Sequence, residues 1–339
     1  MTAIPHLRRL SVSRPGWLAL ALAGLCLATL LSVTVGTRAV GWGDIGAGLS
    51  GRTETIGQAA VALRLPRTAL AALAGAALGL AGALMQGVTR NPLADPGLLG
   101  VNGGAALAVV IGIAWFAIDT VGAYIWAGIG GAAAAACFVS AVGSLGRGGA
   151  TPLKLTLAGA ATSIACASFV LAVILGRNDI AGAVQSWQVG GVGGATFAGL
   201  SPMLPFLATG LVMGLVSARQ LNMLALGDDT AAAFGVRVPL ARGAALGAAV
   251  LLAGATTAIC GPIGFVGLIV PHLCRLLVGV DHRWLLPFSA LTGATLLIAA
   301  DVLGRVIARP AEVDVGIVTA LLGAPVFIGI VRRRRIRDL

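Results

Sequence analysis

Few residues of this chain could carry chemistry, and most of them are arginines. The 339 residues include 23 lysines and arginines, 12 acidic residues, three histidines and five cysteines. The only lysine, Lys154, follows a leucine, so the chain lacks the Gly-Lys-Ser/Thr element that holds nucleotide phosphates. The cysteines lie in or beside apolar runs without the spacing of metal ligands, which indicates small buried side chains. We therefore expect no catalytic residues, no metal site and no cofactor bound by this chain.

The composition is that of a helical membrane protein with many spans. Hydrophobic residues make up 58% of the chain and charged residues 10%, and the mean hydropathy is +0.98. A soluble domain carries about 25% charged residues, and disorder requires low hydrophobicity with high charge. A cytosolic enzyme and a disordered chain are therefore both excluded. The net charge of +11 is typical of the positive-inside rule for membrane proteins, and we expect no nucleic-acid partner.

Uncharged segments divide the chain into candidate membrane spans. Most have about the ~20 residues that a helix needs to cross a bilayer core. The run 243–274 is too long for one helix and is divided at Gly261-Pro262, since proline interrupts helix hydrogen bonding. The segments are 15–37, 68–89, 96–118, 120–146, 155–176, 198–217, the two parts of 243–274, 284–300 and 315–331. The sequence thus predicts an all-α polytopic membrane protein with ten transmembrane helices in one domain, 1–339.

Basic residues set the orientation of these spans. An even number of spans places both chain ends on one side, and the basic ends 1–14 and 332–339 make that side cytoplasmic. Alternating the loops from there puts the whole net charge on the cytoplasmic face, where the basic C-terminus meets anionic lipid. A cleaved signal peptide is the alternative for 15–37, but this run exceeds the usual apolar core of ~7–15 residues and no clear cleavage site follows.

Two parts of the chain resemble each other. Residues 63–66 and 236–239 both read apolar-Arg-apolar-Pro, and 80–83 and 252–255 both read Leu-Ala-Gly-Ala. The first copy enters the membrane from outside and the second from inside. The sequence therefore predicts an inverted repeat of spans two to five and seven to ten, a common device of transporters.

The chain carries no obvious means of driving transport by itself. Ion-coupled transporters usually keep ionisable groups at mid-membrane depth, and here almost every acid lies at a span end or in a loop. Asp301 is the nearest exception, and its position beside Arg305 predicts a structural ion pair. A transport function then needs a partner that hydrolyses nucleotide. An ion-coupled secondary transporter of a small solute is the alternative.

Several motifs resemble the FecCD family of ABC-importer permeases, which take up ferric siderophores, haem and cobalamin. They are Arg64–Arg67, Leu84–Gln86 and Arg90–Asn102, followed by Leu224–Asp229, Gly264–His272 and Gly323–Phe327. The resemblance extends over residues 60–331. Within the family, the sequences of Arg90–Asn102 and Val280–Trp284 are most similar to those of ferric enterobactin permeases. Cobalamin or haem permeases are the alternatives.

The resemblance implies an ATP-driven importer of iron-siderophore complexes in the bacterial cytoplasmic membrane. This chain would be a permease with ten spans and no enzymatic activity. Its partners would be two ATPase subunits that bind ATP and Mg²⁺, a second permease of the same family, and an extracytoplasmic siderophore-binding protein. We favour a heterodimer of two different permeases, and a homodimer is the alternative.

Three arginines at the extracytoplasmic ends of spans are candidates for docking. Arg64 and Arg67 share a helical face, and Arg305 lies near the end of span nine. The resemblance implies that they receive acidic residues of the binding protein, which the planar arginine fork grips well. The alternative is snorkelling to the interface. Three glycines on one face of the second span predict close helix packing: Gly75, Gly79 and Gly82.

Two cytoplasmic segments carry the remaining candidates. Asn91, Pro92 and Leu93 close the second span, and the resemblance implies a gate there, with a plain structural turn as the alternative. The loop 219–242 corresponds to the coupling helix that inserts into an ATPase, with a solvated loop as the alternative. Its acids could start a short helix. The candidate coupling residues are Gly227, Asp228, Asp229, Thr230 and Gly235.

Overall fold

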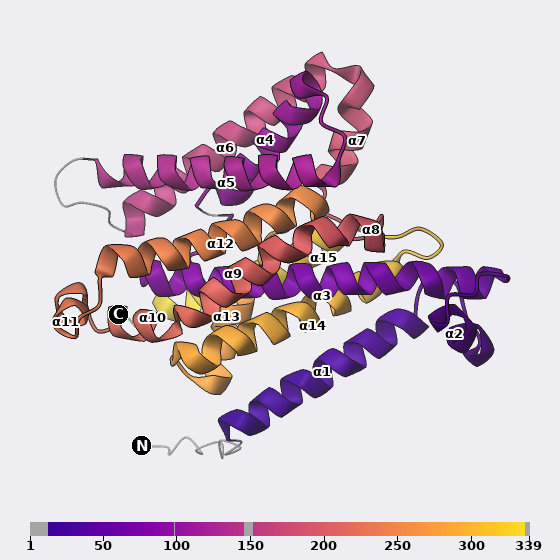
Figure 1. Ribbon diagram of the computed structural model, residues 1–339, viewed down its shortest axis with the longest axis horizontal. Helices are drawn as coiled ribbons and strands as arrows, with labels where there is room; N and C mark the ends of the chain where they lie inside the picture. Colours follow the sequence, from indigo (N-terminus) through magenta and orange to yellow (C-terminus); the bar gives the residue numbers. More distant parts are fainter. Residues whose placement is uncertain (1–12, 98, 146–151, 336–339) are drawn as a thin grey trace.

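The computed structural model describes residues 13–97, 99–145 and 152–335. Within these ranges every regular element is a helix, and the long helices lie side by side in one bundle (Figure 1). The predicted all-α architecture is therefore confirmed. The predicted basic ends, 1–14 and 332–339, fall mostly outside the described residues.

Among the described residues, seven helical segments are long and apolar enough to cross a membrane. Six of them are α1 (Arg14–Thr34), α3 (Ile56–Thr89), α5 (Val121–Ser144), α6 (Pro152–Gly176), α12 (Val238–Cys260) and α14 (His282–Ile307). The seventh is a continuous segment made of α8 (Phe197–Leu200), η1 (Ser201–Met203) and α9 (Leu204–Val216). Three shorter apolar helices accompany them: α4 (Val101–Phe116), α13 (Val266–Val278) and α15 (Val315–Arg335). Each predicted span overlaps one of these elements, so a multi-pass membrane protein is confirmed, and ten crossings stays a prediction.

Short helices lie at both ends of the bundle, and each end is named here after one of them. Figure 1 shows α10 (Ala218–Leu224) and α11 (Asp228–Ala233) together at one end, here called the α11 end. The opposite end, called the α2 end, carries α2 (Trp42–Leu49) and α7 (Asn178–Gln188). The short helix expected at Asp228 is thus confirmed, and the other three short helices were not expected.

Three helices begin at other residues than the predicted spans do, each for a local reason. Helix α3 begins at Ile56 and not at 68, because the Thr55 side chain caps it by accepting a hydrogen bond from the Gln58 nitrogen at 3.2 Å. Helix α4 begins at Val101 because the segment before it forms turns. Helix α13 begins at Val266, several residues after the proline that ends the preceding helix.

The core of the bundle is formed by α3, α12 and α14. In their most apolar stretches, 78%, 67% and 61% of residues are buried, against 17% in α1. A helix buried on nearly all sides must be apolar on all sides, and α3 is uncharged after Arg67 until its end. The remaining long helices surround this core and keep exposed apolar faces that suit lipid or a protein partner.

The predicted packing glycines lie where α3 touches its neighbours backbone to backbone. A Cβ atom added to Gly75 would lie 2.3 Å from the Gly293 carbonyl oxygen on α14, and one on Gly79 would lie 2.4 Å from that of Ser289. A Cβ on Gly82 would lie 1.9 Å from the Gly267 oxygen on α13. Only glycine allows these contacts, because any side chain would force the helices apart.

The packing pairs the elements as the predicted repeat requires. If spans two to five and seven to ten are copies, then α3, α4, α5 correspond to α12, α13, α14. In the structure α3 packs on α14 and α12 packs on α5, and α3 contacts α13 as α12 contacts α4. These are equivalent pairs under an inverted repeat, so the packing supports that prediction.

We predict that Gly82→Ala destabilises the protein by about 1–3 kcal/mol, because the new methyl group overpacks the contact with α13. The measurement is the unfolding free energy in mixed detergent micelles. The matched control is Gly130→Ala on α5, where an added Cβ has no atom within 4 Å. Equal stability of the two variants would contradict the backbone contact.

Candidate functional site

At the α2 end, a buried carboxylate on α14 binds arginines from two helices. Asp301 is 1% exposed, and its Oδ1 accepts hydrogen bonds from Nε and Nη2 of Arg67 on α3, at 2.9 and 2.8 Å. Nη2 of Arg305 lies 3.0 Å from the other carboxylate oxygen. Arg67 also donates to Glu312 at 2.6 Å. The ion pair predicted between Asp301 and Arg305 is therefore confirmed.

Buried arginines also hold the end of α1. A helix leaves its last carbonyls without partners, and such groups are costly in a bilayer. Arg305 donates to the carbonyl oxygens of Ser32 and Val35, at 3.0 and 3.2 Å, and Arg64 donates to that of Val33 at 3.0 Å. The positive guanidinium groups also suit the negative end of the helix dipole. Together they fasten α1 to α3 and α14.

The structure thus brings the three predicted docking arginines together but turns them inward. Arg64 and Arg305 are 6% and 2% exposed, and the Arg67 side chain is 13% exposed. Because Arg64 and Arg305 are buried, their side chains do not snorkel to the membrane interface. Docking by these residues stays a prediction. Sequence reasoning missed the exposed arginines of the same end, which are Arg38, Arg52 and Arg309.

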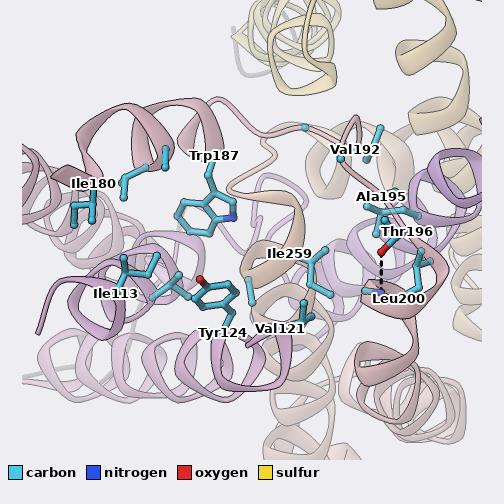
Figure 2. Close-up of a pocket in the computed structure, with 18 of the residues that line it drawn as sticks. Ile113, Val121, Tyr124, Ile180, Trp187, Val192, Ala195, Thr196, Leu200 and Ile259 are labelled. Carbon is cyan, nitrogen blue, oxygen red and sulfur yellow. Dashed lines mark hydrogen bonds between the residues drawn. The ribbon is translucent and has the colours of Figure 1, made fainter. Parts of the chain in front are cut away.

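An apolar cavity of about 470 Å³ lies at the same end, between α4, α5, α7 and α12. Figure 2 shows Trp187 and Tyr124 reaching into it from α7 and α5, with Ile113 and Ile259 beside them. Asp179 lies at this cavity and is paired with Arg177 at 2.7 Å. Sequence reasoning missed the cavity because its lining residues are far apart in the chain.

At the α11 end, two glycines define the ends of α11. Gly227 and Gly235 have φ angles of +115° and +81°, which side-chain-bearing residues rarely adopt. After the last turn, the Gly235 nitrogen donates to the Ala232 oxygen at 2.9 Å and the Val236 nitrogen to the Ala231 oxygen at 3.0 Å. These bonds complete the C-terminal cap. Both predicted glycines therefore shape the short helix.

The two acids of α11 differ in their surroundings. Oδ1 of Asp228 accepts hydrogen bonds from Arg90, at the end of α3, and from Arg242 on α12 at 2.9 Å. Asp229 and Thr230 are exposed. Sequence reasoning treated the acids alike because Asp228 and its arginine on α3 are far apart in the chain.

The predicted gate is a well-formed turn. Arg90 ends α3 with a φ of 50°, in the left-handed region. The Asn91 side-chain oxygen accepts a hydrogen bond from the Leu93 nitrogen at 3.0 Å, and its backbone oxygen accepts one from Ala94 at 3.0 Å. Asparagine favours such turns because its side chain bonds its own backbone two residues on. A gating role for Asn91, Pro92 and Leu93 stays a prediction.

A second cavity, of about 640 Å³, opens toward the α11 end. Its walls come from α3, α5, α6 and α12, and they include Met85, Val88 and Leu246. Arg242 is the one charged residue among the described residues that line it. The arginine that binds Asp228 therefore also belongs to a cavity wall.

Asp281, just before α14, fastens α10 to this end of the bundle. Its carboxylate accepts a hydrogen bond from Asn222 of α10 at 2.6 Å and caps the Arg283 nitrogen at 3.0 Å. Burial alone would raise the pKa of Asp281, but hydrogen bonds from Arg283 and Asn222 outweigh it and lower the pKa to about 2.

A bundle of apolar helices whose ion pairs gather toward its two ends, with a short exposed helix at one of them, is the architecture of a membrane permease subunit. The chain belongs to the FecCD transport family, whose model matches residues 24–333. It is 43% identical over 326 residues to the ferric enterobactin transport system permease protein FepD of Escherichia coli, covering 96% of each chain. It is 40% identical over 283 residues to the hemin transport system permease protein HmuU of Yersinia pestis, covering 80% of this chain and 83% of the relative.

A solved structure shares the fold. It is described as an inward-facing conformation of an ABC transporter of the metal-chelate type, and it superposes with a TM-score of 0.80 at 28% sequence identity. The match covers 94% of this chain and 99% of that one. The family resemblance seen in the sequence is therefore confirmed.

We predict that Asp301→Asn destabilises the protein by about 3–5 kcal/mol, because Arg305 then remains buried without its carboxylate and Arg67 keeps only Glu312. The unfolding free energy in mixed micelles measures this. The control is Glu312→Gln, which removes the 38% exposed partner of the same arginine and should cost less than about 1 kcal/mol. A small loss in Asp301→Asn would contradict the structural role of the carboxylate.

We also predict that Asp281 stabilises the protein in a pH-dependent manner. Its pKa is about 2 in the folded protein and 3.8 otherwise, so its contribution is full above the higher value and disappears as the pH falls through the lower one. The measurement is the thermal midpoint of the protein and of Asp281→Asn across this window. Their difference should shrink as the pH falls, and a constant difference would contradict the assignment.

Proposed function

We propose that this chain is the membrane permease subunit of an ATP-driven importer for iron-siderophore complexes. The observation that carries the proposal is the end-to-end match to FepD, which covers 96% of both chains. Two other relatives are named as permeases of iron(3+)-hydroxamate and iron(3+)-citrate import systems, so iron chelates recur among the cargos in the relatives' names. The likeness to a metal-chelate type transporter structure supports the same class of cargo.

In this proposal the chain crosses the bacterial cytoplasmic membrane ten times, with both ends in the cytoplasm. The α11 end faces the cytoplasm and the α2 end faces outward. Two ATPase subunits supply ATP hydrolysis with Mg²⁺, so the permease itself is not an enzyme. A second, different permease of the family completes the pathway, and a siderophore-binding protein docks outside. Family membership supports this arrangement.

The two ends of the bundle then take distinct roles. The exposed residues of the segment 226–235 contact the ATPase, and the turn at Asn91 contributes to a cytoplasmic gate. The arginine cluster around Asp301 shapes the outer face that receives the binding protein. Because Arg64 and Arg305 are buried, they act by holding α1, while Arg67 stands at the edge of the cluster beside the half-exposed Glu312.

The scarcity of acidic residues in the candidate spans favours this proposal over an ion-coupled transporter. Within the described helices that are candidates for spanning, Asp301 is the only acidic residue. Two arginines hold it at 2.8 and 3.0 Å, which favours a structural role over a role in ion coupling. Haem remains the second candidate cargo because HmuU is also a relative at 40% identity.

The test is uptake in vesicles that contain this chain, its co-expressed permease and ATPase, and the binding protein outside. We predict that ferric siderophore accumulates when ATP and Mg²⁺ are enclosed, and that uptake persists when ionophores collapse the ion gradients. Haem and cobalamin are supplied in parallel as competing cargos. Uptake that stops with the ion gradients while ATP remains would contradict the proposal.

A further inference from the structure

The coupling helix α11 packs against α10 and α12, and one of its oxygen atoms also binds two arginines. Oδ1 of Asp228 accepts hydrogen bonds from Arg90 and Arg242. Arg90 is the residue that ends α3, and Arg242 lies in the first turns of α12. The carboxylate therefore joins α11 and the neighbouring α12 to α3, which is distant in sequence, and α3 and α12 are core helices of the bundle.

Both arginines lie at the α11 end of the bundle, which faces the cytoplasm in the proposed orientation. Arg90 directly precedes the turn at Asn91 and Pro92, and its left-handed backbone sets the direction of that turn. Arg242 lines the cavity of about 640 Å³, whose wall on α3 is formed by Met85, Val88 and Thr89. A displacement of Asp228 would therefore pull on the α3 and α12 walls of this cavity.

Beside these ion pairs, the residues that flank α11 are apolar and exposed. Leu226 and Phe234, which flank the helix, are 61% and 71% exposed, while Ala231 within the helix is fully buried. These residues lie between the candidate spans that end at Val216 and begin at Val238, so lipid does not account for their exposure. An exposed aromatic side chain in this place suits a protein partner.

We infer that Asp228 is a positioning residue that transmits movement of α11 to the cavity walls, while Leu226 and Phe234 make the contact with the ATPase. The inference rests on the proposed function and assigns the two faces of α11 to different tasks. When the ATPase docks, it excludes water from this surface and strengthens the pairs of Asp228. Movement of the apolar contact then reaches Arg90 and Arg242 through the carboxylate.

The exposure of these pairs makes the inference testable without unfolding the protein. The side chains of Asp228 and both arginines are 37–43% exposed, and exposed ion pairs contribute little to stability. Asp228→Asn should therefore fold and insert normally, with an unchanged thermal midpoint. Any loss of transport in this variant then reports on coupling.

The experiment uses the full importer in vesicles, with ATP hydrolysis and ferric-siderophore uptake measured together. In Asp228→Asn we expect the ATPase to remain bound and to hydrolyse ATP, while uptake per ATP falls by about tenfold or more, as for the loss of a charged hydrogen bond. Asp228→Glu keeps the charge and should restore most of the uptake. The double variant Arg90→Gln, Arg242→Gln should reproduce the uncoupling.

Two further variants complete the design. Phe234→Ala should weaken ATPase binding itself, measured by co-purification, and should lower hydrolysis and uptake in the same proportion. Asp119→Asn removes an exposed acid at the opposite end of the bundle and controls for the loss of one surface charge. Release of the ATPase by Asp228→Asn, or normal uptake per ATP in that variant, would overturn the inference.

Hydrogen exchange on the purified permease separates a failure of this inference from a failure of the proposed function. If Asp228 pins α11, amide protection of residues 229–234 falls in Asp228→Asn, whatever the cargo of the intact importer is. Unchanged protection would overturn the inference. Absence of ATP-dependent uptake in the unsubstituted importer, with protection lost in Asp228→Asn, would instead count against the proposed function.

Discussion

A carboxylate buried at the end of a membrane helix is stable only when cations surround it, and the bundle is arranged around that requirement at Asp301. Its two arginine partners come from different places, Arg67 from α3 and Arg305 from its own helix. Arg305 in turn satisfies the last carbonyls of α1. One buried charge therefore fixes the relative position of three helices, because removing any partner would leave an unpaired group in a medium without water.

The glycine contacts make this arrangement rigid along the bundle. Between the ion cluster and the α11 end, α3 and α14 touch backbone to backbone at Gly75, Gly79 and Gly293. Near the α11 end, Gly87 of α3 lies against the His282 ring, whose residue also hydrogen-bonds Asn222 of α10. The helices α3 and α14 are thus held at both ends and in the middle. Close helix contacts therefore tie α3 to α14 along its length.

The sequence was sufficient for the features that depend on composition and local pattern. Apolar runs located every long helix, and the pair Asp301 and Arg305 was predictable because the two residues lie one helical turn apart. The start of α3 was misplaced because its arginines were read as the end of a span, whereas Arg64 donates to a carbonyl of α1 and Arg67 to Asp301. The pairing of Asp228 with Arg90 was out of reach, since only the folded chain brings them together.

The length of α3 carries a consequence for the surrounding lipid. Its 34 residues correspond to roughly 51 Å at 1.5 Å per residue, whereas the hydrocarbon core of a bilayer is ~30 Å thick. An isolated helix of this length would adapt to a thinner or thicker membrane by tilting. Since α3 is joined to α14 along its course, it cannot tilt alone. Adaptation to membrane thickness by tilting therefore requires α3 and α14 to tilt together.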